Sequence, residues 1–227
     1  MKKLLLLGLG LSITMCAHAL AEYELETEDY FTNASMGCMM MRECTKNVKE
    51  VKSIKDIEDY QRKDHSLIAS EFNDVLKAVN DVGINVYIAP MEYFLIGTRG
   101  VYYTEGNNIF LNADMVERST SLISTFRHEG WHGVQDCMAG DIKNSFIAIV
   151  YPQDKVPKHL QALAENTYTA ADKVSSVIWE KEAYWMGHTE GATIKALKAC
   201  KAGNMWTEYS PTPQTREFLV EKGYIKE

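Results

Sequence analysis

The chain has 227 residues, of which 46% are hydrophobic and 24% charged, and its formal net charge is −7 at pH 7. This length and composition are typical of one globular domain with a sizeable core. The acidic balance argues against nucleic acid and anionic membranes as partners, because both attract basic surfaces.

The first 21 residues have the pattern of a secretory signal peptide. Lys2 and Lys3 form a basic start, an apolar run covers residues 4–15, and Ala-x-Ala cleavage patterns lie within residues 17–21. This run is too short to cross a bilayer comfortably, and no later run is long and apolar enough. We therefore expect a soluble, exported protein, secreted or periplasmic, with no membrane span.

Four cysteines follow the signal peptide: Cys38, Cys44, Cys137 and Cys200. An even number in an exported chain predicts disulfides. Cys38 and Cys44 are close in sequence and predict a local loop, which leaves Cys137 to pair with Cys200. The alternative is that a thiol of the N-terminal segment caps a metal ion.

Residues 22–65 read as an N-terminal lead-in segment, acidic and turn-rich at first and highly charged from residue 45 onward. The first clear element is a helix over residues 66–82, because apolar residues recur there on one helical face. These residues are Ile68, Phe72, Val75, Leu76 and Val79. Gly83 then ends the helix.

Three short strands are predicted after this helix. Residues 84–89 alternate between apolar and other residues and read as a strand that Pro90 ends. Residues 101–105 and 109–112 read as two more strands, and the turn-forming residues 106–108 between them predict a hairpin.

A second long helix is predicted from about residue 119 to Gly140. Gly130 and Gly133 lie inside it, and each costs about 1 kcal/mol relative to alanine in a helix interior. A plain surface helix has no reason to carry them. They indicate that another part of the chain, or a substrate, approaches this helix closely.

Residues 128–132 of this helix read His-Glu-Gly-Trp-His, an H-E-x-x-H motif. Residues four apart share one helical face, so His128 and His132 can bind a single metal ion, for which zinc is the natural choice. Glu129 lies about 100° round the helix, near the ion but off the ligand line. A carboxylate there can take a proton from zinc-activated water.

The residues around the motif extend it. Residues 125–134 read Thr-Phe-Arg-His-Glu-Gly-Trp-His-Gly-Val. The zincin metallopeptidases have Val or Thr, an uncharged residue and any residue before H-E, and after it two uncharged residues, His, an uncharged residue and a hydrophobic one. Every position fits, so the segment resembles a zincin active-site helix.

The resemblance implies an α+β fold: a zincin-like domain over residues 66–227 with a small antiparallel or mixed sheet, the H-E-x-x-H helix and a helical C-terminal half. It also implies that the last edge strand, here 109–112, runs along the cleft and pairs with an extended substrate.

The C-terminal half reads as mainly helical. Residues 146–150 are apolar and predict a buried strand or loop, and helical character resumes after them. A long helical pattern covers residues 173–200, where Gly187 and Gly191 can interrupt it. A last short helix is predicted over residues 213–222.

A catalytic zinc usually has three protein ligands, so one more is needed. Met138 stands where the metzincin pattern has a third histidine. The resemblance to the glutamate-zincin branch implies a carboxylate on a later helix instead. The candidates are Glu165, Glu180, Glu182 and Glu190, with His159 and His188 as alternatives.

We predict Glu180 as the third ligand. Glu180 and Ala183 match the Glu-x-x-Ala pattern of several zincin families, although Tyr184 stands where an Asp commonly follows. Glu180 also shares a helical face with the small residues Ala183 and Gly187, which permit a close approach to the H-E-x-x-H helix. Glu182 lies about 200° away, among bulky residues.

The group that stabilises the oxyanion stays open between Tyr184, Tyr168 and His188. The function expected from these residues and from the resemblance is that of an exported zinc metallopeptidase. Zinc-activated water would attack a peptide or protein substrate, with Glu129 as general base. The alternatives are a zincin-fold binding protein with structural zinc, and a metal-free interaction domain stapled by disulfides.

Overall fold

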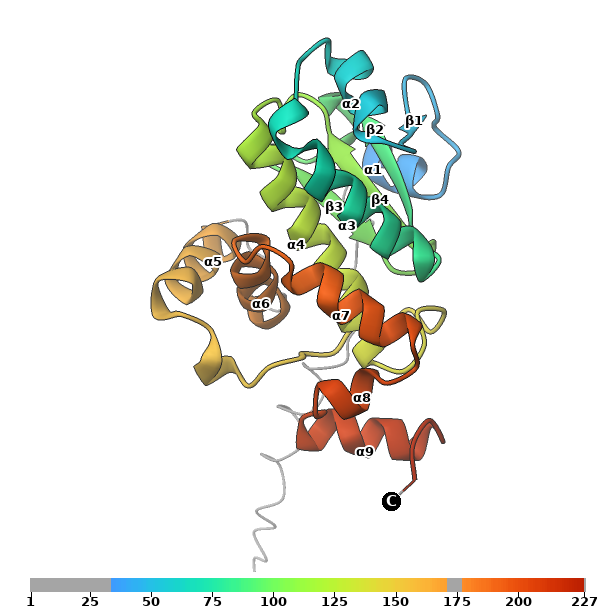
Figure 1. Ribbon diagram of the computed structural model, residues 1–227, viewed down its shortest axis with the longest axis vertical. Helices are drawn as coiled ribbons and strands as arrows, with labels where there is room; N and C mark the ends of the chain where they lie inside the picture. The colour runs from blue at the N-terminus through green and yellow to red at the C-terminus, as the bar shows by residue number, and fades with distance from the viewer. Residues whose placement is uncertain (1–33, 171–176, 227) are drawn as a thin grey trace, which may run out of the picture.

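The computed structural model describes residues 34–170 and 177–226 of the chain. The expected signal peptide and the first part of the expected lead-in segment lie outside these residues. The described chain has an α+β fold, in which a small mixed sheet with its covering helices adjoins a mainly helical C-terminal half (Figure 1).

Helices dominate the described residues. They are α1 (Ala34–Met40), α2 (Ile54–Gln61), α3 (Ala69–Asp81), α4 (Ser119–Met138), α5 (Lys158–Ala170), α6 (Val177–Gly187), α7 (Ala192–Lys201), α8 (Met205–Glu208) and α9 (Pro213–Glu221). The strands are β1 (Lys49–Glu50), β2 (Asn85–Ala89), β3 (Gly100–Tyr103) and β4 (Asn108–Asn112). Short 3₁₀ turns cover Ser66–Ile68, Met91–Tyr93 and Gln153–Lys155.

The strands form one sheet in the order β1-β2-β4-β3. The pairs β1–β2 and β3–β4 are antiparallel, whereas β2 and β4 are parallel. The predicted hairpin is present, with Val101 opposite Phe110. The prediction that residues 109–112 form the edge strand is wrong, because β4 pairs with a strand on each side. The edge strands are β1 and β3.

The alternation of side chains along the strands gives the sheet two buried faces. Ile88, Tyr102 and Leu111 point to the face that α3 and α4 cover. Tyr87 and Phe110 point to the other face, where α1 packs with three buried methionines, Met36, Met39 and Met40. Residues 34–50, part of the expected lead-in segment, therefore supply both a strand of the sheet and a covering layer for it.

The glycines of α4 lie where other elements come close. A Cβ added at Gly130 would stand 2.9 Å from Cγ2 of Thr193 on α7, and one at Gly133 would meet Cδ1 of Ile84. Both positions are therefore closely approached by other parts of the chain, as two glycines inside one helix predict.

Helices α6 and α7 pack on α4 from the C-terminal half (Figure 1). The long helical pattern is divided near Gly187 and Gly191, as the glycines suggested, and Gly191 has a positive φ of 75°. Residues 146–150 are a loop with a buried apolar part rather than a strand.

Both predicted disulfides are present. Cys38 is bonded to Cys44, and Cys137 is bonded to Cys200. The first closes the loop after α1, so Cys38 offers no free thiol to a metal ion. The second joins the last turn of α4 to the last turn of α7. Disulfides of this kind are typical of exported proteins.

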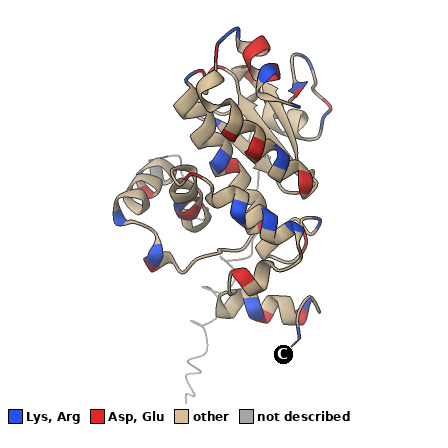
Figure 2. Cartoon of the chain, in the orientation of Figure 1, with Lys and Arg blue, Asp and Glu red and all other residues tan. Residues whose placement is uncertain are grey.

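Arg127 connects three of the helices. Its Nε donates to Oε1 of Glu71 on α3 at 2.6 Å, and its Nη1 donates to the carbonyl of Gly187 on α6 at 3.4 Å. Charged side chains also occur on the outer surfaces. Helix α3 carries three carboxylates and one lysine, whereas the charged residues of α7 are lysines (Figure 2). Lys201 on α7 lies 3.5 Å from Asp81 at the end of α3.

Among the described helices, none has the combination of length and apolar character that a membrane crossing requires.

Candidate metal centre

Helices α4 and α6 build the candidate site between them. The close contact depends on Gly187, because a Cβ there would stand 2.9 Å from the carbonyl oxygen of Ser124 and 3.3 Å from Cβ of His128. Ala183, one turn earlier on the same face of α6, is fully buried. These two small residues allow a carboxylate on α6 to reach the imidazoles on α4.

Three side chains converge where the helices meet. The Nε2 atom of His128 lies 3.0 Å from Oε2 of Glu180 and 3.3 Å from Nε2 of His132. The Nε2 atom of His132 lies 3.6 Å from Oε1 of Glu180. One ligand atom from each residue can be chosen so that all lie within 4.8 Å of one another. His128, His132 and Glu180 can therefore hold a metal ion together.

The donor set fits a metal ion better than a hydrogen-bonded core. Glu180 is buried, and its Oε2 atom has no hydrogen-bond partner of acceptable geometry among the described residues. Burial opposes ionisation of Glu180, but the charges of His132 and His128 outweigh it and lower the pKa of Glu180 well below its usual range. A buried carboxylate facing two imidazole nitrogens is typical of a site for zinc.

Glu129 lies beside this cluster, under the edge strand β3. It is buried, and a Cβ added at Gly100 of β3 would stand 2.9 Å from its Oε1 atom. Burial raises the pKa of Glu129 to about 8; the charge of His132 and the backbone of Tyr102 lower it, and the charge of Glu180 raises it. Such a carboxyl group is suited to exchange protons near neutral pH.

Glu182 is turned away from the cluster, but it is not a solvated residue. It is fully buried, and its carboxylate accepts from Nε1 of Trp131, Nε2 of Gln135 and the backbone N–H groups of Val150 and Tyr151. Burial raises the pKa of Glu182 to about 7, although these donors oppose the rise. The packing argument that separated Glu180 from Glu182 did not predict this buried position.

The other sequence candidates for the third ligand lie on the surface. Glu165 makes an ion pair with Lys181 at 2.7 Å. Glu190, His159 and His188 are exposed. None of the four belongs to the His128–His132–Glu180 cluster, which is the group of metal-ligating side chains found among the described residues.

The three candidates for the oxyanion stabiliser differ in position. Tyr168 on α5 interacts with Glu180 closely enough to lower the pKa of that carboxyl, and burial together with the charge of Glu180 raises the pKa of the Tyr168 phenol well above 10. Tyr184 packs its ring edge-on against His128, with ring centroids 5.2 Å apart. His188 is exposed, and its Nδ1 atom lies 2.7 Å from the carbonyl of Tyr184. Tyr168 therefore has the most direct polar contact with the centre.

Gln135 and Asp136 follow the motif closely in sequence, but sequence reasoning could assign neither as a partner of the histidines. Gln135 is fully buried one turn after His132. Its Oε1 atom lies 2.8 Å from Nδ1 of His132. A polar residue three positions after a predicted ligand, on the same side of the helix, is the signal that could have identified it.

No protein-family model, curated protein or solved structure matches the chain.

Proposed function

We propose that the protein is an exported zinc-dependent peptidase whose metal is held by His128, His132 and Glu180. The observation that carries the proposal is the convergence of these three side chains, with the buried carboxyl of Glu129 alongside. Two imidazoles and one carboxylate are the ligand set of many catalytic zinc sites. Among the described residues no fourth His, Cys, Asp or Glu joins the cluster, which is consistent with a coordination position left for substrate or water.

Zinc would supply Lewis acidity in this site, polarising a peptide carbonyl and lowering the pKa of water. The chain's own part in the reaction falls to Glu129. Its carboxylate accepts the proton of the attacking water and then passes it to the leaving amine.

The edge strand β3 supplies a place for an extended substrate. The N–H of Asn112 donates to the carbonyl of Arg99, so Arg99 and Val101 direct their backbone groups toward β4. In an antiparallel pair the intervening residues, Gly100 and Tyr102, direct theirs away from β4. A peptide that pairs with this side of β3 would pass next to Glu129, and main-chain pairing of this kind accepts many sequences.

Tyr168 is the residue that we propose as hydrogen-bond donor to the developing oxyanion. It interacts with Glu180 directly and with the charge of Glu129, so its phenol belongs to the same small polar region. A phenol kept protonated by burial is able to donate at any physiological pH. Tyr168→Phe should therefore lower kcat while zinc remains bound.

The test uses the mature protein purified without a histidine tag. It is incubated with a denatured protein mixture, with and without o-phenanthroline, and new peptide termini are identified by mass spectrometry. A peptidase produces termini that disappear with the chelator and return with added zinc. Zinc bound without new termini would favour a binding protein with structural zinc, and absence of both would favour a metal-free interaction domain.

A further inference from the structure

A buried polar chain runs from His132 away from the proposed metal position. Oε1 of Gln135 lies 2.8 Å from Nδ1 of His132. On the other side, Nε2 of Gln135 donates to Oε2 of Glu182 and to the carbonyl oxygen of Trp179, each at 3.0 Å. His132, Gln135 and Glu182 are all buried.

The surroundings determine which way the amide of Gln135 points. Its Nε2 side faces the carboxylate of Glu182 and the backbone carbonyl of Trp179. A backbone carbonyl can only accept a hydrogen bond, and the same is true of a carboxylate when it is ionised. The reversed amide would place its oxygen against two other acceptors. The hydrogen-bond network therefore assigns the oxygen of Gln135 to the His132 side.

The orientation of Gln135 in turn selects the tautomer of His132. An amide oxygen can only accept, so the Nδ1 atom of His132 must carry the proton. The lone pair of the neutral ring is then on Nε2, the atom that lies 3.3 Å from Nε2 of His128 and 3.6 Å from Oε1 of Glu180. The imidazole is thus prepared to bind a metal ion before one arrives.

Glu182 is held by groups that only donate. Besides Gln135, Nε1 of Trp131 lies 3.3 Å from its Oε2 atom, and the N–H of Val150 lies 2.9 Å from its Oε1 atom. The N–H of Tyr151 donates to the same Oε1 atom. The carboxylate is therefore fixed by α4 and by the loop after it, and it offers Gln135 an acceptor at a constant position.

We propose that Gln135 and Glu182 are positioning residues of the metal centre. Glu182 orients the amide of Gln135, and Gln135 holds His132 with Nδ1 protonated and Nε2 directed at the ion. Tyr184 stands where an Asp commonly follows the Glu-x-x-Ala pattern, and this chain has the glutamine–glutamate pair behind its second histidine. The proposal rests on the metal site of the proposed function, but it does not require peptidase activity.

The first test is nitrogen-15 NMR of the imidazoles in the metal-free wild-type protein. As the ring of His132 is titrated to neutrality, Nδ1 should keep its proton and Nε2 should lose it. In Gln135→Met, which has a similar length and no amide, this preference should disappear. A neutral His132 that carries its proton on Nε2 in the wild-type protein would overturn the proposal, whatever the fate of the variant.

The second test is zinc affinity by competition with a chromophoric chelator. Gln135→Met should bind zinc about 10–100-fold more weakly than the wild-type protein, as is usual when a partner of a ligating histidine is removed. The matched control is Asp136→Asn, the neighbouring buried polar residue of α4, whose side chain hydrogen-bonds with Tyr102 and with no histidine of the described residues. Its zinc affinity should equal that of the wild-type protein.

Equal zinc affinity in Gln135→Met and the wild-type protein would contradict a positioning role. Equal loss in Gln135→Met and Asp136→Asn would contradict it as well, because the effect would then come from general disturbance of α4. Neither readout involves substrate cleavage, so a failure of this proposal is distinguishable from a failure of the peptidase assignment.

Discussion

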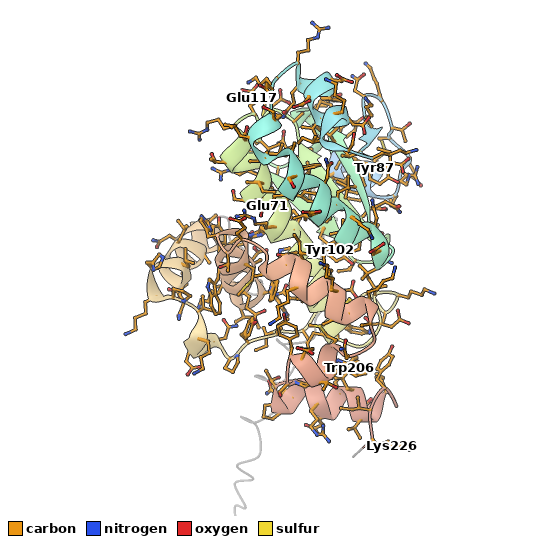
Figure 3. The ribbon with its side chains drawn as sticks, in the orientation of Figure 1. Glu71, Tyr87, Tyr102, Glu117, Trp206 and Lys226 are labelled. Atoms are coloured by element: carbon orange, nitrogen blue, oxygen red, sulfur yellow. A yellow bond between two sulfur atoms is a disulfide. The ribbon has the colours of Figure 1, made fainter. Side chains whose placement is uncertain are left out.

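Gly100 on the edge strand lies directly against Glu129 on α4. A methyl group at residue 100 would stand 2.8 Å from Cγ of Glu129 and 2.9 Å from its Oε1 atom. These separations are too short for carbon and oxygen atoms that are not bonded, so the glutamate would have to move. Tyr102 of the same strand, labelled in Figure 3, approaches Glu129 with its backbone and Asp136 with its hydroxyl.

Gly100→Ala should lower peptidase kcat by about 100-fold, because a displacement of about 1 Å is enough to misplace a catalytic group by that factor. Zinc content should not change, since the atoms nearest to the added methyl group belong to Glu129 and Thr125 rather than to a proposed ligand. The control is Gly106→Ala on the same hairpin, where the added Cβ would instead meet Cδ1 of Tyr103 at 2.7 Å. Equal activity in the two variants would argue against the placement of Glu129.

Glu129→Gln should keep the fold and the zinc but lower turnover by about 10²–10⁴-fold, the usual contribution of general acid–base catalysis. The amide fills the same volume and cannot accept the proton of water. Zinc content by mass spectrometry and kcat on a cleaved peptide are the measurements. Full activity in Glu129→Gln would remove the proposed mechanism, even with zinc bound.

The pH dependence of folding should contain a contribution from Asp136. Oη of Tyr102 lies 2.8 Å from Oδ2 of Asp136 and 3.1 Å from Oδ1 of Asn107. Burial raises the pKa of Asp136 well above its usual value of 3.8; the hydrogen bond with Tyr102 opposes this rise, and the charge of Asp141 adds to it. A protonated Asp136 can donate to the Tyr102 hydroxyl, which then donates to Asn107.

The sign of the effect follows from proton uptake. Between pH 3.8 and the raised pKa, the folded protein holds a proton on Asp136 that the unfolded chain has lost. Stability from this group is therefore complete at low pH and falls as the pH rises, by at most about 1.4 kcal/mol per pH unit. The free energy of unfolding of the metal-free protein is measured by urea unfolding from about pH 4 to about pH 8. It should change less with pH in Asp136→Asn than in the wild-type protein. Parallel profiles would contradict a neutral Asp136.

The two disulfides should differ in their effect on stability. Cys137–Cys200 closes a sequence separation of 63 residues, and Cys38–Cys44 closes one of 6. When each cysteine pair is replaced by serines, chain entropy predicts that the free energy of unfolding falls by about 4 kcal/mol for Cys137–Cys200 and by about 2 kcal/mol for Cys38–Cys44. Urea unfolding of the two double variants measures both losses. A larger loss for the Cys38–Cys44 variant would show that its contribution is not set by loop length.

The candidate site was predictable to a large extent because its determinants are local. Helical spacing alone places His128 and His132 on one face. The choice of Glu180 depended on Gly187, and the contact of Gly187 with Ser124 and His128 is the close approach that the argument needed. The buried role of Glu182 was not predictable, because its donors at residues 150 and 151 come from a distant loop.

The fold was predictable element by element, but the assembly of the elements was not. Periodicity predicted α3, β2 and the β3–β4 hairpin, since each is built from its own sequence pattern. The position of β4 between β2 and β3 depends on which strands pair at long range. The same is true of α1, whose methionines have no periodic pattern that indicates a sheet as their partner.

The central claim is that Glu180 completes a zinc site with His128 and His132, and its most direct test is the zinc content of single variants. Metal analysis should find one zinc per chain in the untagged wild-type protein and in the control Glu165→Gln, whose glutamate is on the surface. Glu180→Gln, His128→Ala and His132→Ala should each lose stoichiometric zinc. Full zinc occupancy in Glu180→Gln, or in either histidine variant, would contradict the account.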